Sequence, residues 1–265
     1  MRRWAPIALA LSVATVALAL ALSSPPPARA GCADCRRPPP RAPWQWQLDG
    51  RLDLSVPARV YDVDGFDTSR ATVARLHRAG RYVVCYVDVG TWENWRPDRR
   101  RFPARALGAP NGWPGERWLD VRQLALLAPL LRARFAICRA KGFDAVEPDN
   151  VDAYANRSGF PLRARDQLRF NRWIARAVHA QRLAVALKND LGQAAALQPS
   201  FDFAVVEQCF QYRECGLTRP FLRAHKGVYD AEYALPRAAF CGAARRLGVN
   251  AMRKRMGLGA WREPC

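Results

Sequence analysis

The sequence beyond residue 43 alternates between short apolar runs and longer segments whose apolar residues recur every three or four positions. The short runs have the length of buried strands, and the longer segments have the periodicity of amphipathic helices. Such an alternation predicts a sheet covered by helices in an α/β fold.

Eight segments have the composition of strands: 44–48, 59–64, 82–89, 143–149, 183–187, 201–209, 226–233 and, as the least regular candidate, 256–261. Helices are expected at 70–79, from Leu124 to Cys138, from Leu168 to Val178 and at 240–246. Pro129 lies within the second helical pattern, which predicts either a helix start or a kink there.

Eight strands separated by helices indicate a (β/α)8 TIM barrel. A doubly wound open sheet is the alternative. It is weakened because no expected strand is followed by a glycine-rich phosphate-binding loop. Polar residues gather at the carboxyl ends of at least six strands, which is where a barrel builds its site.

The segment Phe143-Asp-Ala-Val-Glu-Pro-Asp-Asn150 is the sharpest of these strand ends. Strand periodicity places Glu147 and Asp149 on one face, and the same pattern in 201–209 ends at Glu207. Asp149 and Glu207 are therefore candidate catalytic carboxylates, since glycoside cleavage uses two acids in different protonation states.

A ring of strand-end acids surrounds this pair. It comprises Asp62, Asp64, Asp88, Glu147, Asp149, Glu207 and Glu232. One such acid alone is more often a helix cap or an arginine partner, but the whole ring favours a site, where neighbouring carboxylates push their pKa values apart. Calcium or magnesium is a competing use of an acid ring. The three histidines lack zinc-site spacing, and no Gly-x-Ser-x-Gly motif is present.

Residues 90–121 form a long segment rich in Trp, Pro and Gly, and long loops in compact domains are usually functional. Tryptophans lie in this segment or at expected strand ends, where two or three are candidates to stack on sugar faces. They are Trp44, Trp46, Trp92, Trp95, Trp113, Trp118 and Trp261.

Residues 1–30 read as a cleaved signal peptide, with Arg2 and Arg3 before an apolar run and Ala28-Arg29-Ala30 as the cleavage site. A membrane anchor and a lipoprotein acylated at Cys32 are the alternatives. Residues 31–43 are expected to be a Pro/Arg-rich flexible lead-in, and residues 44–265 a single catalytic domain. The protein is thus expected to be secreted, either extracellular or periplasmic.

All eight cysteines follow the cleavage site, and an even count in an exported chain favours disulfides. Sequence alone leaves 105 pairings open. Cys209 is close to Cys215, Cys241 and Cys265 can tie down the C-terminus, and Cys85 points toward the helical layer that carries Cys138. The Cys32–Cys35 spacing fits a redox pair, but its Pro/Arg setting favours a local disulfide or a dispensable tail.

The formal net charge is +19, which favours anionic partners. The basic residues are spread through helices and loops without interleaved aromatics, so the pattern does not indicate a nucleic-acid platform. Solvated arginine faces are the simpler interpretation.

With these motifs in order, the chain resembles glycoside hydrolase family 114, the endo-α-1,4-polygalactosaminidases. The resemblance spans nearly all of the mature chain. It is carried by residues 44–48, 61–67, 85–93, 115–122, 142–152, 187–190, 206–209, 232–233 and 260–261.

The resemblance implies a (β/α)8 barrel that cleaves α-1,4-linked galactosamine-containing polysaccharide. It implies Asp149 as nucleophile and Glu207 as general acid/base, with retention of anomeric configuration. No cofactor, metal, nucleic acid or partner chain is expected. The expected substrate-binding residues are Trp46, Asp62, Asp64, Tyr86, Asp88, Glu147, Lys188, Asn189, Glu232, Tyr233 and Trp261. Spare carboxylates among them are candidates to bind the ammonium groups of galactosamine.

Two other functions remain open at this point. One is a glycosidase acting on another amino-sugar or uronate polymer. The other is a catalytically silent barrel that binds anionic envelope polymers through its arginines.

Overall fold

The structure is a computed structural model and describes residue 32 and residues 34–265. The signal peptide expected at residues 1–30 lies outside the described residues. Across the described part of the chain, no helix combines the length and apolarity that crossing a membrane requires.

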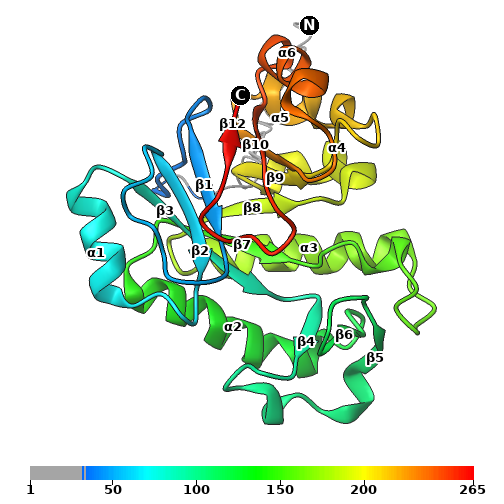
Figure 1. Cartoon of the computed structure of the whole chain (residues 1–265). Helices are drawn as coiled ribbons and strands as arrows, with labels where there is room; N and C mark the ends of the chain where they lie inside the picture. Colours follow the sequence, from blue (N-terminus) through cyan, green and yellow to red (C-terminus); the bar gives the residue numbers. More distant parts are fainter. Residues whose placement is uncertain (1–31, 33) are drawn as a thin grey trace, which may run out of the picture.

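Eight parallel strands form one curled sheet, with helices on its outer side (Figure 1). In sheet order they are β1 (Trp44–Gln47), β2 (Val60–Asp64), β3 (Tyr82–Asp88), β7 (Ala145–Asp149), β8 (Ala184–Lys188), β9 (Phe203–Glu207), β10 (Val228–Glu232) and β11 (Asn250–Arg253). Strand order follows chain order throughout, which confirms the TIM-barrel prediction.

The C-terminal segment lies between the two ends of this sheet. Strand β12 (Glu263–Pro264) pairs antiparallel with β11. The backbone N–H of Leu48 donates to Leu258 O at 3.0 Å, and Arg262 donates to Trp44 O at 2.9 Å. The Trp44 indole N–H reaches Asn250 O at 2.8 Å. The C-terminus therefore links β1 to β11.

The eighth strand of the barrel differs from the sequence expectation. Residues 256–261 form turns that precede β12, and the strand is Asn250–Arg253. The sequence gives no clear strand pattern here, because the strand has polar residues at both ends and only its two middle residues, Ala251 and Met252, are buried.

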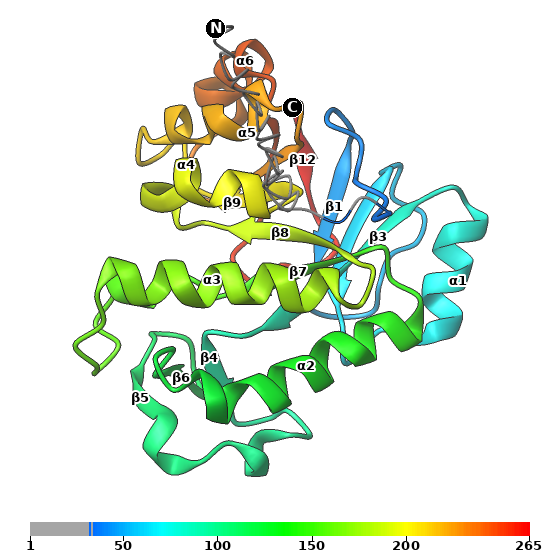
Figure 2. The same ribbon diagram turned by 180° about the vertical axis from the view of Figure 1, so that it is seen from behind.

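Long helices cover the outer side of the sheet. They are α1 (Arg70–Arg78), α2 (Leu124–Lys141), α3 (Ala164–His179) and α6 (Arg237–Leu247), with short α4 (Ala194–Leu197) and α5 (Arg219–Arg223). Figure 2 shows α2 and α3 side by side against the outside of β7 and β8. Helix α2 begins at Leu124 and continues through Pro129, and it ends at Gly142, whose φ of 88° suits glycine.

Two apolar layers lie on opposite faces of the strands. The larger one fills the space between the sheet and the helices. The smaller one fills the barrel interior, where large side chains such as Trp46 and Phe203 lie among small ones such as Ala145 and Ala186. Because strand side chains alternate, the residues that continue the interior rows at the carboxyl ends point toward the barrel mouth.

The segment 90–121 is not an irregular loop. It contains an antiparallel sheet of β4 (Thr91–Glu93), β6 (Glu116–Leu119) and β5 (Leu107–Pro110). Its entry passes directly over the end of β7, since a Cβ on Gly90 would lie 1.6 Å from Asn150 O. Glycine at position 90 thus allows the small sheet to start beside Asp149.

Disulfides join Cys32 to Cys35, Cys85 to Cys138, Cys209 to Cys215 and Cys241 to Cys265. Residues 34–43, which the sequence suggested as a flexible lead-in, lie across the amino-terminal end of the barrel. Tyr82 and Tyr229 donate hydrogen bonds to Arg36 O and Pro39 O from the barrel interior. Arg37 pairs with buried Asp202 at 3.1 Å.

Candidate active site

A cavity of about 530 Å³ opens at the carboxyl ends of the strands. Asp149, Lys188 and Glu207 lie on its floor, and the small sheet and the C-terminal turn form its walls. Seven sequence-predicted site residues line it: Trp46, Asp64, Tyr86, Asp149, Lys188, Glu207 and Tyr233.

Asp149 is held as a carboxylate. Its Oδ1 accepts hydrogen bonds from Lys188 Nζ at 2.9 Å and from the Asn150 backbone N–H at 2.7 Å, and its Oδ2 accepts from the Tyr86 hydroxyl at 2.9 Å. Burial alone would raise the pKa of Asp149, but Lys188 and these donors outweigh it and lower the pKa below its ordinary value.

Glu207 lies one strand beyond Lys188 and is more open to the cavity. Its Oε1 accepts a short hydrogen bond from the Tyr233 hydroxyl, and its Oε2 accepts from Asn189 Nδ2 at 3.1 Å. The Asn189 side chain also accepts the Glu207 backbone N–H at 2.9 Å. The strand-end amide therefore fixes both the backbone and the carboxyl of Glu207.

Lys188 connects the two acids. Its Nζ lies 2.9 Å from Asp149 Oδ1 and 3.2 Å from Glu207 Oε2. Burial alone would lower the pKa of Lys188, but the facing carboxylates of Asp149 and Glu207 raise it well above its ordinary value. The ammonium therefore stays charged and keeps the carboxyl groups of Asp149 and Glu207 close together.

Asp62 and Glu147 lie one layer deeper in the barrel. Their side chains are buried and do not line the cavity. Lys188 Nζ is 3.5 Å from Glu147 Oε1. The interior row of each strand thus places these two carboxyls beneath the lysine, out of direct reach of a ligand in the cavity.

Asp64 lines the cavity, but its charge is already paired. Its Oδ2 accepts from Arg96 at 2.6 Å, and Arg96 also contacts Glu93 at 2.6 Å. Glu93 is bound in turn by buried Arg134 at 3.0 Å. These arginines come from the 90–121 segment and α2, so a buried ion-pair network attaches the small sheet to the barrel.

Four other expected site residues do not line this cavity. Asp88 is buried and accepts hydrogen bonds from Thr91 and Asn150, which fixes the turn after β3. Trp261 lies under Arg255, whose guanidinium carbon is 4.9 Å from the ring centroid. Glu232 points outward from β10 and accepts the Phe210 N–H at 2.8 Å. Asn189 lines a neighbouring cavity instead.

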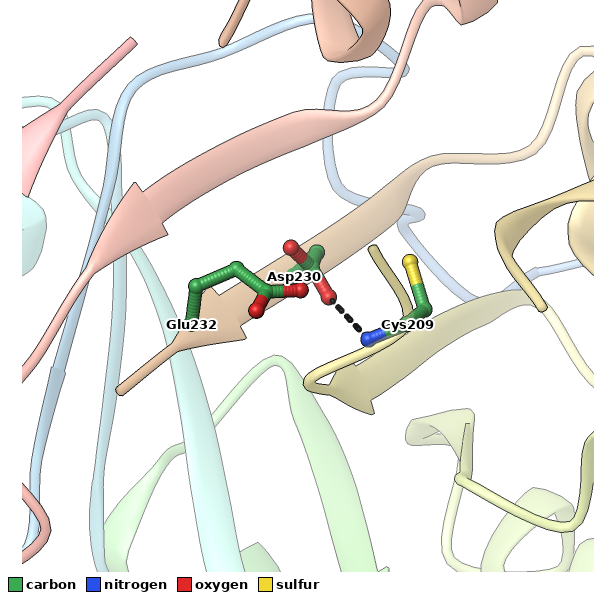
Figure 3. A group of neighbouring side chains, drawn as sticks. All are labelled: Cys209, Asp230 and Glu232. Carbon is green, nitrogen blue, oxygen red and sulfur yellow. Dashed lines mark hydrogen bonds between the residues drawn. The ribbon is translucent and has the colours of Figure 1, made fainter. Parts of the chain in front are cut away.

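Figure 3 shows Glu232 with Asp230 and Cys209, a group whose oxygen and sulfur atoms lie close enough to suggest a metal site. The Cys209 sulfur is bonded to Cys215, and Asp230 Oδ1 accepts the Cys209 N–H at 3.3 Å. A disulfide sulfur has no thiolate to offer, so the donor set does not fit a thiolate-bound metal.

A second acid group, Asp88, Glu93 and Glu116, also lies close together. Arg96 and Arg134 bind Glu93, the Thr91 backbone N–H donates to Asp88, and the Thr91 hydroxyl contacts both Asp88 and Glu116. All three acids thus have protein hydrogen-bond donors, and Glu93 has two arginine partners, which makes this group a structural network.

The structure places two of the predicted sugar-stacking tryptophans in the cavity and adds two acids that the sequence analysis left out. Trp95 and Trp113 are 45% and 49% exposed and line the cavity from the small sheet. Asp152 and Asp190 line a neighbouring cavity; they lie in the segments that follow two strand ends, and only the turns after β7 and β8 bring them together.

Two further cavities adjoin the central one. One of about 370 Å³ shares Glu207, Tyr233 and Met256 with it, and includes Asp152 and Asp190. Another, of about 780 Å³, shares four residues with the central cavity: Leu48, Asp49, Asp64 and Asp67. The three cavities together outline a groove across the barrel mouth.

Comparison with solved structures supports this reading of the fold. The structure of Aspergillus fumigatus Ega3 in complex with galactosamine is similar with a TM-score of 0.82 and 34% sequence identity, covering 87% of this chain and 97% of that one. The glycoside hydrolase domain of PelA from Pseudomonas aeruginosa is similar with a TM-score of 0.66 and 15% identity, covering 83% of this chain and 97% of that one.

A search of curated proteins found no match. The family model of glycoside-hydrolase family GH114 matches residues 24–265, which include every residue of the barrel and its cavity. The chain therefore belongs to glycoside-hydrolase family GH114.

Proposed function

We propose that this glycoside hydrolase is exported and cleaves α-1,4-linked galactosamine polymers internally, with retention at the anomeric carbon. The observation that carries the proposal is the shared contact of Asp149 and Glu207 with the Lys188 ammonium. Four disulfides among the described residues suit an oxidising compartment outside the cytoplasm.

The spacing of the two acids favours retention. Because Nζ is 2.9 Å from one carboxylate oxygen and 3.2 Å from the other, these oxygens lie no more than about 6 Å apart. Retaining glycosidases hold their carboxyl groups about 5–5.5 Å apart, whereas inverting ones need about 6.5–9.5 Å to admit a water molecule.

Asp149 is suited to the role of nucleophile. The contacts with Lys188, Tyr86 and the Asn150 N–H keep it ionised and leave its carboxylate facing the cavity. Attack on the anomeric carbon forms a glycosyl ester with Asp149 and breaks the bond to the leaving-group oxygen.

Glu207 is the proposed general acid/base. It gives its proton to the departing oxygen and then takes one from the water that hydrolyses the ester. Tyr233 and Asn189 hold its two oxygens from opposite sides, so the carboxyl keeps one orientation in both steps.

Internal cleavage fits the groove. The cavities on both sides of the central one share lining residues with it, so a polymer has room to continue past the catalytic pair in both directions. Trp95 and Trp113 are exposed at its edge and offer flat faces to sugar rings.

Free galactosamine units carry ammonium groups, and the groove offers carboxyls to receive them. Asp49, Asp53 and Asp67 lie on one side of the catalytic pair, and Asp152, Asp190 and Glu214 lie on the other. Ega3, whose structure holds galactosamine, is the related protein that makes this sugar the first substrate to test.

The test measures reducing ends released from partially deacetylated α-1,4-polygalactosamine by the wild type, Asp149→Asn and Glu207→Gln. Asp34→Asn, an exposed acid at the opposite end of the barrel, is the matched control. We expect the wild type and the control to be active, and both catalytic variants to lose at least about 1,000-fold in rate.

Two further readouts complete the assignment. Proton NMR at early times is expected to detect the α-anomer of the new reducing end, and early products are expected to be oligomers of mixed length. A β-anomer released first rules out retention, and single sugars as the only early product rule out internal cleavage. Full activity in Asp149→Asn rules out Asp149 as the nucleophile.

A further inference from the structure

Two carboxyl side chains beneath the catalytic pair have no ordinary hydrogen-bond donor. Asp62 is 1% exposed and Glu147 is fully buried. None of their four oxygens accepts a hydrogen bond from an N–H or O–H group of the described residues. A buried carboxylate without a donor is strongly unfavourable, so the arrangement requires an explanation.

The surrounding charges supply one. Asp62 on β2 faces Glu147 and Asp149 on β7 and Lys188 on β8, and Glu147 also faces Glu207 on β9. One ammonium thus serves four carboxyl groups. If all four were ionised, three negative charges would remain unbalanced inside the barrel, at a large cost in desolvation.

A proton between Asp62 and Glu147 gives their oxygens a donor and lowers the unbalanced charge from three to two. The two carboxyls lie within hydrogen-bonding reach of each other, so a protonated one donates to the other. Glu147 lies 3.5 Å from Lys188 Nζ and is the better placed of the two to carry the negative charge. The proton then belongs on Asp62.

We propose that Asp62 is a positioning residue that stays protonated and donates a hydrogen bond to the Glu147 carboxylate. Glu147 in turn contacts Lys188 from below, opposite Asp149 and Glu207. This pair keeps the ammonium directed at the two catalytic acids, and Asp62 itself does not touch the substrate.

The titration behaviour of the pair agrees with this geometry. Burial and the neighbouring Glu147 raise the pKa of Asp62 well above its ordinary value. Burial raises the pKa of Glu147 to about 7, with Lys188 opposing the rise. Two carboxyls that share a site in this way titrate as a unit and hold one proton between them.

Infrared spectroscopy tests the proton without any substrate. At pH 8, where Glu147 with a pKa of about 7 is mostly ionised, the difference spectrum of wild type minus Asp62→Asn is expected to show one protonated-carboxyl C=O band. If the two spectra match in this region, Asp62 is ionised and the proposal is wrong.

Kinetics test the positioning role. Asp62→Asn keeps a donor toward Glu147, whereas Asp62→Ala removes it. We expect kcat at pH 8, where Glu147 is mostly ionised, to fall about 10- to 100-fold in Asp62→Ala and less than about 5-fold in Asp62→Asn. Because an amide has no proton to lose, the alkaline limb of the pH profile is expected to move to higher pH in Asp62→Asn.

Asp230→Asn is the matched control. Asp230 is equally buried on β10 but faces outward and contacts the Cys209 N–H, as Figure 3 shows. The pH profile of this variant is expected to follow the wild type. A shift equal to that of Asp62→Asn contradicts the proposal.

The kinetic part rests on the proposed function, and the infrared part does not. If the wild type fails to cleave α-1,4-polygalactosamine, the proposed function is wrong. The infrared comparison still shows in that case whether Asp62 is protonated. If the wild type is active and Asp62→Ala equals it, or if Asp62→Asn is as inactive as Asp62→Ala, the positioning role is wrong.

Discussion

The ammonium of Lys188 lies 4.7 Å from the centroid of the Trp46 ring. Trp46 is on β1 and Lys188 on β8, so the contact crosses the barrel interior. The indole ring adds a cation–π contact to the carboxylates around the ammonium, and such a contact gains strength when water is excluded. A strand-end lysine thereby keeps its charge at the centre of the site.

Replacing Lys188 with Met is expected to lower kcat by at least about 100-fold and to move the acid limb of kcat/KM to higher pH. Lys188 is the main cause of the lowered pKa of Asp149, so without it the nucleophile is protonated over a wider acidic range. Rate–pH profiles measure this. Lys254→Met is the control, since Lys254 is also buried but donates to Gly259 O; an unmoved acid limb in Lys188→Met contradicts the argument.

Tyr86→Phe and Tyr233→Phe test the roles of Asp149 and Glu207 one at a time. Loss of the Tyr86 hydroxyl removes a hydrogen bond to Asp149 and is expected to raise the pKa of that acid, which again moves the acid limb upward. Loss of the Tyr233 hydroxyl removes a donor to Glu207. Each variant is expected to lower kcat about 10- to 100-fold, because hydrogen bonds to charged groups contribute about 1.5–3 kcal/mol. Equal acid-limb shifts in both variants contradict the assignment.

Arg134→Met is expected to destabilise the fold by about 3–5 kcal/mol, since it removes the arginine that binds Asp98 and one of the two buried arginines that bind Glu93. Urea unfolding measures the loss. Arg132 on the same helix is exposed, and its guanidinium carbon lies 5.5 Å from the centroid of the Trp173 ring. Because this is a cation–π contact at the surface, Arg132→Met is expected to cost less than about 1 kcal/mol. Similar losses in both variants mean that the ion-pair network adds little.

The outer surface and the groove carry opposite charge. Among acidic residues of the described chain only Asp34, Asp49 and Asp67 are exposed, and the last two line the groove. Exposed arginines occur on every long helix. A cationic polymer is therefore repelled at long range and attracted only within the groove.

This separation predicts an unusual salt dependence. Raising ionic strength from 0.01 M to 0.1 M shortens the screening length from about 30 Å to about 10 Å, which removes the long-range repulsion first. We expect kcat/KM on the deacetylated polymer to rise about 2- to 3-fold over this range, and to stay flat on the N-acetylated, uncharged polymer. A steady fall with salt on the deacetylated polymer contradicts this expectation.

Much of the site could be placed from strand ends alone. Asp149, Lys188 and Glu207 end neighbouring parallel strands, and their alternation with buried residues placed all three at the barrel mouth. The eighth strand could not be placed in this way, because β11 has only two buried residues and its polar ends resemble a loop.

Depth along the strand was harder to infer. Glu147 lies only two residues before Asp149 on the same interior row, yet it is buried beneath Lys188. Glu232 looks like another strand-end acid, but in the structure it faces the turn after β9 and is bound by backbone N–H groups. A periodicity of two residues gives the face of a strand relative to its own neighbours, not which face the barrel encloses.

The sequence by itself determined the alternation of strands and helices and the acids that end the strands, because these depend on local periodicity. Tertiary structure decided which carboxyls share Lys188, which are neutralised by Arg96 and Arg134, and which lie in the groove. Those outcomes depend on distances between residues far apart in the chain, and the charge of each acid is set by the partner that the fold brings to it.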